Sequence, residues 1–207
     1  MCSKYKEILE EPDLRKYAEK LFAQIKKDFG LDYLPLELKI NERQNIGITT
    51  NGGTSNCLDF MVLNYHKDNP LSRVGIFAIL MHELNHAKQD EIAIATDYKA
   101  YTKAVAFRSR QNPQNSCYTQ EELEKFIIDE IGTDTIANIR NKNGIIDEGS
   151  QLYKQGMTYI DNAKNYVEMK EFDAELFKKY KKQILEKESY DVQYKAEELY
   201  YYLNNKK

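Results

Sequence analysis

Residues 69–89 read Asn-Pro-Leu-Ser-Arg-Val-Gly-Ile-Phe-Ala-Ile-Leu-Met-His-Glu-Leu-Asn-His-Ala-Lys-Gln and predict the helix that organises the fold. Asn69 is a favourable N-cap and Pro70 suits the first helical position, so we expect a helix from about residue 70 to about residue 89. On the face through positions 71, 75, 78, 82, 86 and 89 the residues are Leu, Gly, Ala, His, His and Gln. The small residues upstream of the histidines predict room beside the helix for a metal ion and a substrate.

The centre of this helix has the form HExxH, with His82 and His86 separated by one helical turn. Two histidines four residues apart project from the same face of a helix, so one zinc ion can accept a nitrogen from each. Glu83 points to the side, where it can take a proton from the water that the metal activates. The motif predicts a catalytic zinc site with Glu83 as the general base.

Two or three strands are expected before the helix. Leu36, Leu38 and Ile40 alternate with polar residues as in a strand, and residues 46–50 are a second candidate. A turn is expected at 51–53, and Leu58–Tyr65 is the most strand-like segment of the chain. The pattern therefore favours an α+β fold in which a small mixed sheet precedes the metal-binding helix.

Helical patterns occupy most of the remaining chain. Residues 12–29 have an apolar face, and Gly30 follows as a stop signal. Thr96 is expected to cap a second helix that reaches about Arg110. Residues 119–122 read Thr-Gln-Glu-Glu, a capping box that predicts the start of a third helix.

The third helix carries two acids in an apolar stripe. Its face at 123, 127, 130, 134 and 137 reads Leu, Ile, Glu, Asp and Ala. Buried carboxylates are costly unless they are paired or bind a metal, so Glu130 is the first choice for the third zinc ligand. Asp134 would then accept a hydrogen bond from the outer nitrogen of a ligating histidine and fix its tautomer.

The segments 82–89 (His-Glu-Leu-Asn-His-Ala-Lys-Gln) and 130–134 (Glu-Ile-Gly-Thr-Asp) together resemble the gluzincin group of zinc metallopeptidases. The resemblance covers roughly residues 36–140 and implies a zincin-like core, bound Zn²⁺ and hydrolysis of peptide bonds. It also implies that Leu58–Tyr65 is an edge strand above the cleft, to which an extended peptide substrate adds as a further strand.

Three other residues are alternatives to Glu130 as the third metal ligand. The sequence segment between His86 and Glu130 is longer than in compact gluzincins and contains an extra helix. Asp97 opens the second helix, although an acid at a helix N-terminus is also favoured by the helix dipole alone. Asp90 lies one turn beyond His86. His66 is the remaining histidine of the chain.

The two parts of the chain are expected to differ. Residues 1–149 would form the metallopeptidase core, and residues 150–207 a Tyr- and Lys-rich helical appendage with a break near 171–173. Such an appendage could cover the cleft and keep the enzyme latent, in which case its removal would raise activity. A second hypothesis is a metal-stabilised or inactive zincin-like binding or regulatory protein that cuts nothing.

Composition limits the partners. The 207 residues carry a net charge of −3 with lysines spread throughout, which disfavours nucleic acid and leaves a peptide or protein as the expected partner. The longest apolar run, Val74–Met81, is too short to span a bilayer. Three cysteines without motif spacing and the absence of an apolar leader indicate a cytoplasmic protein. If a leader had been removed before Cys2, a lipoprotein or secreted protein would be the alternative.

Overall fold

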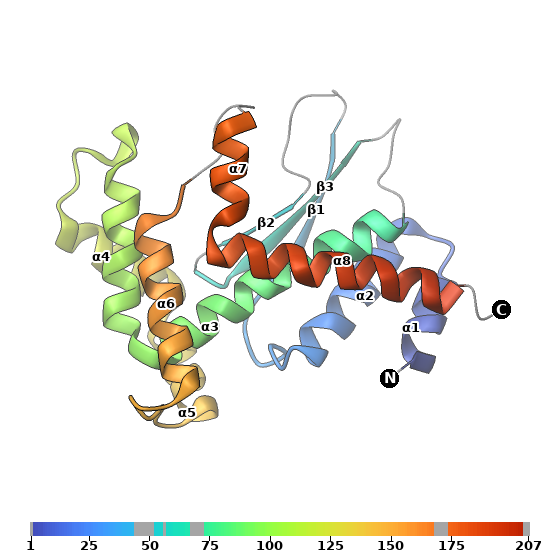
Figure 1. Ribbon diagram of the computed structural model, residues 1–207, viewed down its shortest axis with the longest axis horizontal. Helices are drawn as coiled ribbons and strands as arrows, with labels where there is room; N and C mark the ends of the chain where they lie inside the picture. Colours follow the sequence, from blue (N-terminus) through green and yellow to red (C-terminus); the bar gives the residue numbers. More distant parts are fainter. Residues whose placement is uncertain (1, 44–51, 56, 67–72, 168–173, 205–207) are drawn as a thin grey trace. The chain divides into compact units, whose positions relative to one another are not determined.

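The computed structural model describes residues 2–43, 52–55, 57–66, 73–167 and 174–204. Its contacts divide the chain into two compact units. Unit 1 comprises Met1–Ser55, Phe60–His86 and Glu188–Lys207, and unit 2 comprises Asn56–Asp59 and Ala87–Lys187. Two helices, α3 (Arg73–Arg110) and α8 (Ile184–Asn204), contribute to both units (Figure 1). The expected boundary between residues 149 and 150 stays a prediction.

Unit 1 combines a small sheet with helices. Its elements are α1 (Cys2–Leu9), α2 (Leu14–Asp28), β1 (Glu37–Arg43), β2 (Gly52–Thr54), β3 (Phe60–His66) and parts of α3 and α8. The strand order is β1-β3-β2, with β1 parallel and β2 antiparallel to β3. The expected α+β class with a small mixed sheet is therefore confirmed. Three predicted features lie outside the described residues: the strand at 46–50, the turn residue Asn51 and the helix start at Asn69 and Pro70.

Strand β3 is the centre of the sheet, which corrects the edge position expected for Leu58–Tyr65. Its whole length pairs with β1, from Phe60 opposite Glu37 to His66 opposite Arg43. On its other side β2 pairs with residues 61–63. A central strand has its backbone groups already bonded on both sides, so the stretch that β2 covers has no free edge for a substrate peptide.

Helix α2 begins and ends where its sequence dictates. The Asp13 side chain accepts a hydrogen bond from the backbone N–H of Lys16, which satisfies one of the first free donors of the helix. At the other end Gly30 has φ +66°, and the N–H groups of Gly30 and Leu31 donate to the carbonyls of Lys27 and Lys26. This Schellman ending confirms the predicted stop.

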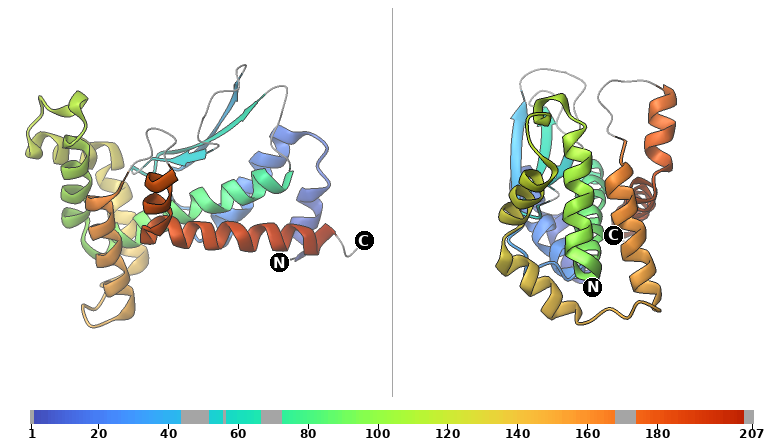
Figure 2. Two further views of the ribbon diagram at one scale, coloured as in Figure 1. Left: turned by 45° about the horizontal axis from the view of Figure 1, so that its top comes forward. Right: turned by 90° about the vertical axis from the view of Figure 1, so that its left-hand side faces the viewer.

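Unit 2 is helical in its described residues. It holds the second part of α3, η1 (Pro113–Asn115), α4 (Gln120–Ile131), α5 (Thr133–Asn143), α6 (Gln151–Asn165), α7 (Ala174–Lys182) and the first turn of α8. Helix α6 runs beside the second part of α3 (Figure 2). The two helices approach closely at Gly156, where an added Cβ would lie 2.0 Å from Thr96 Oγ1.

The two predicted helices are present as the two segments of α3, which meet at a kink. The kink lies at Asp97, whose φ of −156° and ψ of 94° are extended rather than helical. The Asp97 side chain accepts a hydrogen bond from the N–H of Ala100, so Asp97 caps the second part of α3. The predicted cap at Thr96 is wrong by one residue, because the Thr96 hydroxyl donates backwards to the carbonyl of Ile92.

The capping box at Thr119 and Glu122 is confirmed, but the helix that it starts is shorter than predicted. Gly132, with φ +82°, ends α4, and α5 begins at Thr133. Glu130 and Asp134 therefore belong to different helices. The predicted shared stripe fails because a 3.6-residue period does not continue across a residue in a left-handed conformation.

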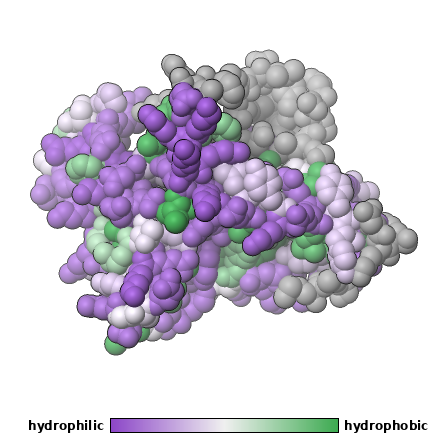
Figure 3. Space-filling model, in the orientation of Figure 1, coloured by the Kyte–Doolittle hydropathy of each residue, from purple (hydrophilic) through white to green (hydrophobic). Residues whose placement is uncertain are grey.

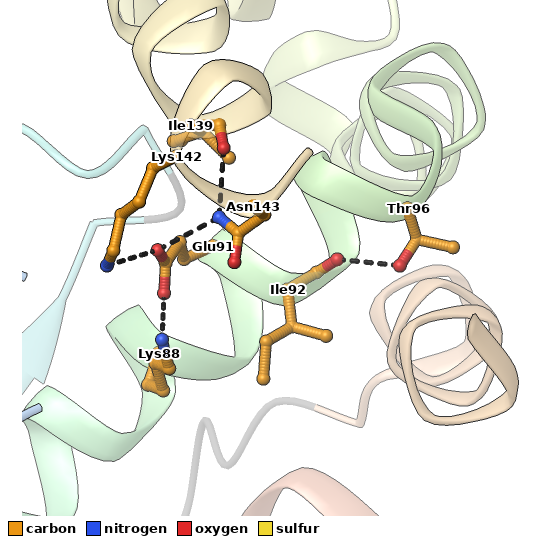
Figure 4. Close-up of polar contacts among 7 residues, drawn as sticks. All are labelled: Lys88, Glu91, Ile92, Thr96, Ile139, Lys142 and Asn143. Atoms are coloured by element: carbon orange, nitrogen blue, oxygen red, sulfur yellow. Dashed lines mark hydrogen bonds and ion pairs between the residues drawn. The ribbon is translucent and has the colours of Figure 1, made fainter. Parts of the chain in front are cut away.

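A buried carboxylate ties α3 to α5 within unit 2. Figure 4 shows Glu91 between Lys88, Lys142 and Asn143. Glu91 is fully buried; Lys142 Nζ lies 2.9 Å from its Oε1, Asn143 donates to the same oxygen, and Lys88 binds Oε2. Three donors satisfy both oxygens, so the charge is stabilised without a metal.

The face of the molecule in Figure 3 is mainly hydrophilic, with small and separate apolar areas, as a charged-residue content of 30% implies. None of the helices in the described residues has a segment both long and apolar enough to cross a membrane.

Candidate metal centre

The HExxH motif lies in unit 1, on the first part of α3, where its geometry is regular. His82 is 7% exposed and His86 is half-buried. Their Nε2 atoms lie 3.2 Å apart, and the two rings meet nearly edge to face with an angle of 77°. Both histidines thus direct the same nitrogen toward one point beside the helix.

This spacing matches what a zinc ion requires. With Zn–N distances of about 2.0–2.1 Å and tetrahedral angles, two ligating nitrogens lie about 3.3 Å apart. The observed 3.2 Å between the Nε2 atoms would also suit a direct hydrogen bond between a neutral pair of imidazoles. The pair is therefore preorganised for a metal and can also be satisfied by itself.

The part of α8 that belongs to unit 1 packs on the histidines. Ser189 Oγ lies 3.3 Å from His86 Nδ1 and accepts a hydrogen bond of 3.0 Å from the Asn85 amide. The ring of Tyr190 stands edge-on to His82, with centroids 4.8 Å apart. When a metal binds His86 Nε2, the proton of the neutral ring is on Nδ1. This N–H group can then donate a hydrogen bond to the Ser189 hydroxyl.

These contacts correct the expectation of an open space beside the histidine face. Ser189 is fully buried, and Ala78 and Gln89 on the same face of α3 are also buried. Small residues upstream of a histidine leave room, but a neighbouring helix can fill that room as readily as a substrate. Here α8 lies along this part of α3 (Figure 1).

Glu186 is a fully buried acid at the start of α8, in unit 2. Within the same unit the Gln89 amide donates to the carbonyl of Leu185, the residue before Glu186. Glu186 lies one turn before Ser189 and Tyr190 on α8.

The start of α8 is held in place inside unit 2. The phenol of Tyr166 donates to Glu186 Oε1. The Gln183 side chain bonds both backbone groups of Val167, accepting from its N–H at 2.7 Å and donating to its carbonyl at 3.1 Å. Burial, followed by the Glu186 carboxylate, raises the pKa of Tyr166, so this phenol remains a donor at neutral pH.

The acids first chosen from the sequence lie on two helices of unit 2. Glu130, on α4, and Asp134, in the first turn of α5, are both exposed. The position expected for Asp134, beside the outer nitrogen of a histidine, is taken by Ser189 at His86. Glu83 is half-buried on α3.

The alternative ligands have other partners or lie outside the description. Asp97 is exposed and caps the second part of α3, as the simpler interpretation of that residue predicted. Asp90 is buried beside Tyr101, where burial and then the Asp90 carboxylate raise the pKa of that phenol. His66 ends β3, and its side chain lies outside the described residues.

Sequence reasoning missed Glu186 and Ser189 because it treated the C-terminal segment as an appendage. One signal was present. Glu186 and Ser189 are polar residues next to an apolar stripe of α8 formed by Leu185, Ala196 and Leu203. The argument that favoured Glu130, a carboxylate among buried apolar residues, applies better to Glu186.

No family model, no curated protein and no solved structure matches this chain.

Proposed function

We propose that this protein is a zinc-dependent peptidase of the HExxH type. The observation that carries the proposal is the 3.2 Å separation of His82 Nε2 and His86 Nε2 on a helix with Glu83 between them. A zinc ion, when bound, supplies the Lewis acid that activates water and polarises the scissile carbonyl.

The residues of the chain would divide the remaining work. His82 and His86 hold the metal, and a carboxylate is the third ligand, because two imidazoles and one carboxylate form a usual catalytic zinc set. Ser189 orients His86. Glu83 takes a proton from the attacking water and passes it to the leaving amine.

A second candidate is a metal-stabilised protein without hydrolytic activity. The observation that favours it is the burial of His82 beneath Tyr190, which leaves His82 only 7% exposed. A substrate carbonyl must approach the metal, whereas a structural metal needs no approach. The two candidates share the ligands and differ in the role of Glu83.

The first experiment measures the metal content of the purified chain by mass spectrometry after zinc loading and gel filtration. We expect about one zinc per chain, lost in His86→Ala. Replacing the third ligand should strongly reduce the zinc content, so Glu130→Gln and Glu186→Gln are compared as the two acid candidates. Equal zinc in an acid variant and the native chain would remove that acid from the ligand set, and no zinc in any chain would end both proposals.

The second experiment separates the two candidates. The zinc-loaded chain is incubated with a peptide library, and cleavage is followed by mass spectrometry with and without a chelator. Glu83→Gln should retain zinc but lose about 10²-fold or more of the cleavage rate, because it lacks the general base. Zinc binding without any chelator-sensitive cleavage would favour the non-hydrolytic candidate.

A further inference from the structure

A pocket of about 500 Å³ lies wholly within unit 2, between α6 and the second part of α3. Each helix contributes one face, formed by residues with the i, i+3, i+4, i+7 spacing. From α3 these residues are Ala100, Lys103, Ala104 and Phe107, and from α6 they are Met157, Ile160, Asp161 and Lys164. The volume is in the usual range for small-molecule sites.

The floor of the pocket is apolar, and its hollow has a local cause. Ala100 and Ala104 stand one turn apart on α3, so two methyl groups occupy a place that larger side chains would fill. The aromatic ring of Phe107 remains 43% exposed and Met157 remains 37% exposed. An apolar ligand body could cover these surfaces, which water now contacts.

The rim is cationic. Lys103, Arg110 and Lys164 face a single carboxylate, that of Asp161, so the rim has two positive charges in excess. Asp161 also accepts a hydrogen bond of 3.2 Å from the amide of Asn165. The Lys164 ammonium lies 5.1 Å from the centre of the Phe107 ring, which places a cation directly beside the apolar surface.

Helix α4 contributes Gln120 to the lining of the pocket. The Gln120 amide donates to the carbonyl of Lys103 at 3.0 Å and to Glu124 at 2.9 Å. This bridge fixes the start of α4 against α3. The apolar face from Ala100 to Phe107 extends about 10 Å along the helix axis, the length of a medium-chain acyl group.

We propose that this pocket binds a small amphiphilic anion, a medium-chain carboxylate whose apolar tail covers Ala104 and Phe107 while its head group meets Lys103 and Lys164. The excess positive charge on the rim favours an anionic ligand over a neutral one of the same length. The apolar floor favours an anion with an apolar tail over an inorganic anion. The proposal does not depend on the metal site.

The test is calorimetric titration of the full chain with decanoate, using decanol as the neutral ligand of equal length. We expect saturable binding of decanoate at one site and weaker binding of decanol. The double variant Lys103→Gln/Lys164→Gln should weaken decanoate binding about tenfold or more and leave decanol binding nearly unchanged. Lys154→Gln on the same helix α6, whose side chain does not line the pocket, is the matched control.

A second variant tests the floor. Ala104→Leu places a larger side chain in the hollow and should abolish binding of both ligands, while circular dichroism verifies that the chain is folded. The proposal is overturned if decanoate does not bind, if decanol binds as tightly, or if decanoate binding survives both the charge and the floor variants.

Discussion

Ser189 is a buried polar residue in contact with the histidine pair of the candidate metal centre. It is fully buried, accepts from Asn85 and lies against His86 Nδ1. A partner at the outer nitrogen of a ligating histidine fixes both the tautomer and the ring orientation. The hydroxyl would therefore act on a bound metal through His86 rather than by touching it.

Ser189→Ala should lower the zinc affinity by about 10–100-fold without removing the site. Competition with a chromogenic chelator measures the affinity. Ser189→Thr, which keeps the hydroxyl, should retain most of it if the added methyl is tolerated. An unchanged affinity in Ser189→Ala would mean that the contact with His86 is incidental.

At this scale the approach of the two histidines was predictable from the sequence, but their surroundings were not. His82 and His86 converge because i, i+4 spacing on one helix is a local property. Ser189 lies 103 residues from His86, and such a contact depends on how two helices pack. Glu130 was chosen on a helical period that Gly132 interrupts.

Among the elements, α3 shows how two local signals produce one kinked helix. Asp97 leaves helical geometry and caps the segment that follows, while Thr96 bonds back to Ile92. Helix α6 approaches at this kink, where Gly156 leaves no room for a side chain. The kink, the cap and the close approach thus occur within one turn of α3.

Gly156→Ala should destabilise the chain by about 1–3 kcal/mol, because the new methyl would overlap the Thr96 side chain. Alanine otherwise favours a helix over glycine by about 1 kcal/mol, so the sign of the change is diagnostic. Thermal melting measures the change. Gly149→Ala is the control, since its Cβ would lie 3.5 Å from Asp147 and should cost little. A stabilised Gly156→Ala variant would show that α6 does not approach α3 this closely.

Element boundaries were predictable where caps define them. The N-cap of α4 at Thr119 and the stop of α2 at Gly30 follow from side-chain and backbone preferences within four residues. The central position of β3 in the sheet was not predictable, because strand order depends on which strands pair with one another in the folded chain.

On the scale of the whole molecule, metal binding and stability should be linked. A ligand that binds only the folded state adds about 2.7 kcal/mol at a hundredfold excess over its Kd. For a chain of 207 residues this corresponds to a rise in Tm of about 5–10 °C. Calorimetry with zinc and with a chelator should show this rise in the native chain. His86→Ala should show none, and an equal rise in that variant would indicate zinc bound elsewhere.

Removal of the C-terminal segment should abolish zinc binding, not raise activity as the lid hypothesis expected. Residues 188–204 belong to unit 1, where Ser189, Ala196 and Leu203 are buried. A chain ending at residue 149 would expose this apolar surface and lose Glu186 and Ser189 together. Zinc content and circular dichroism of the truncated chain test this, and a folded, zinc-binding fragment would restore the lid hypothesis.

The separation of 103 residues between His86 and Ser189 has a consequence for synthesis. At about 5–20 residues per second, the ribosome adds α8 about 5–20 s after the HExxH helix. During that interval the nascent histidines lack Ser189, which lies against His86 Nδ1 in the folded chain. A nascent chain with peptidase chemistry would therefore have an incomplete site until α8 has been synthesised.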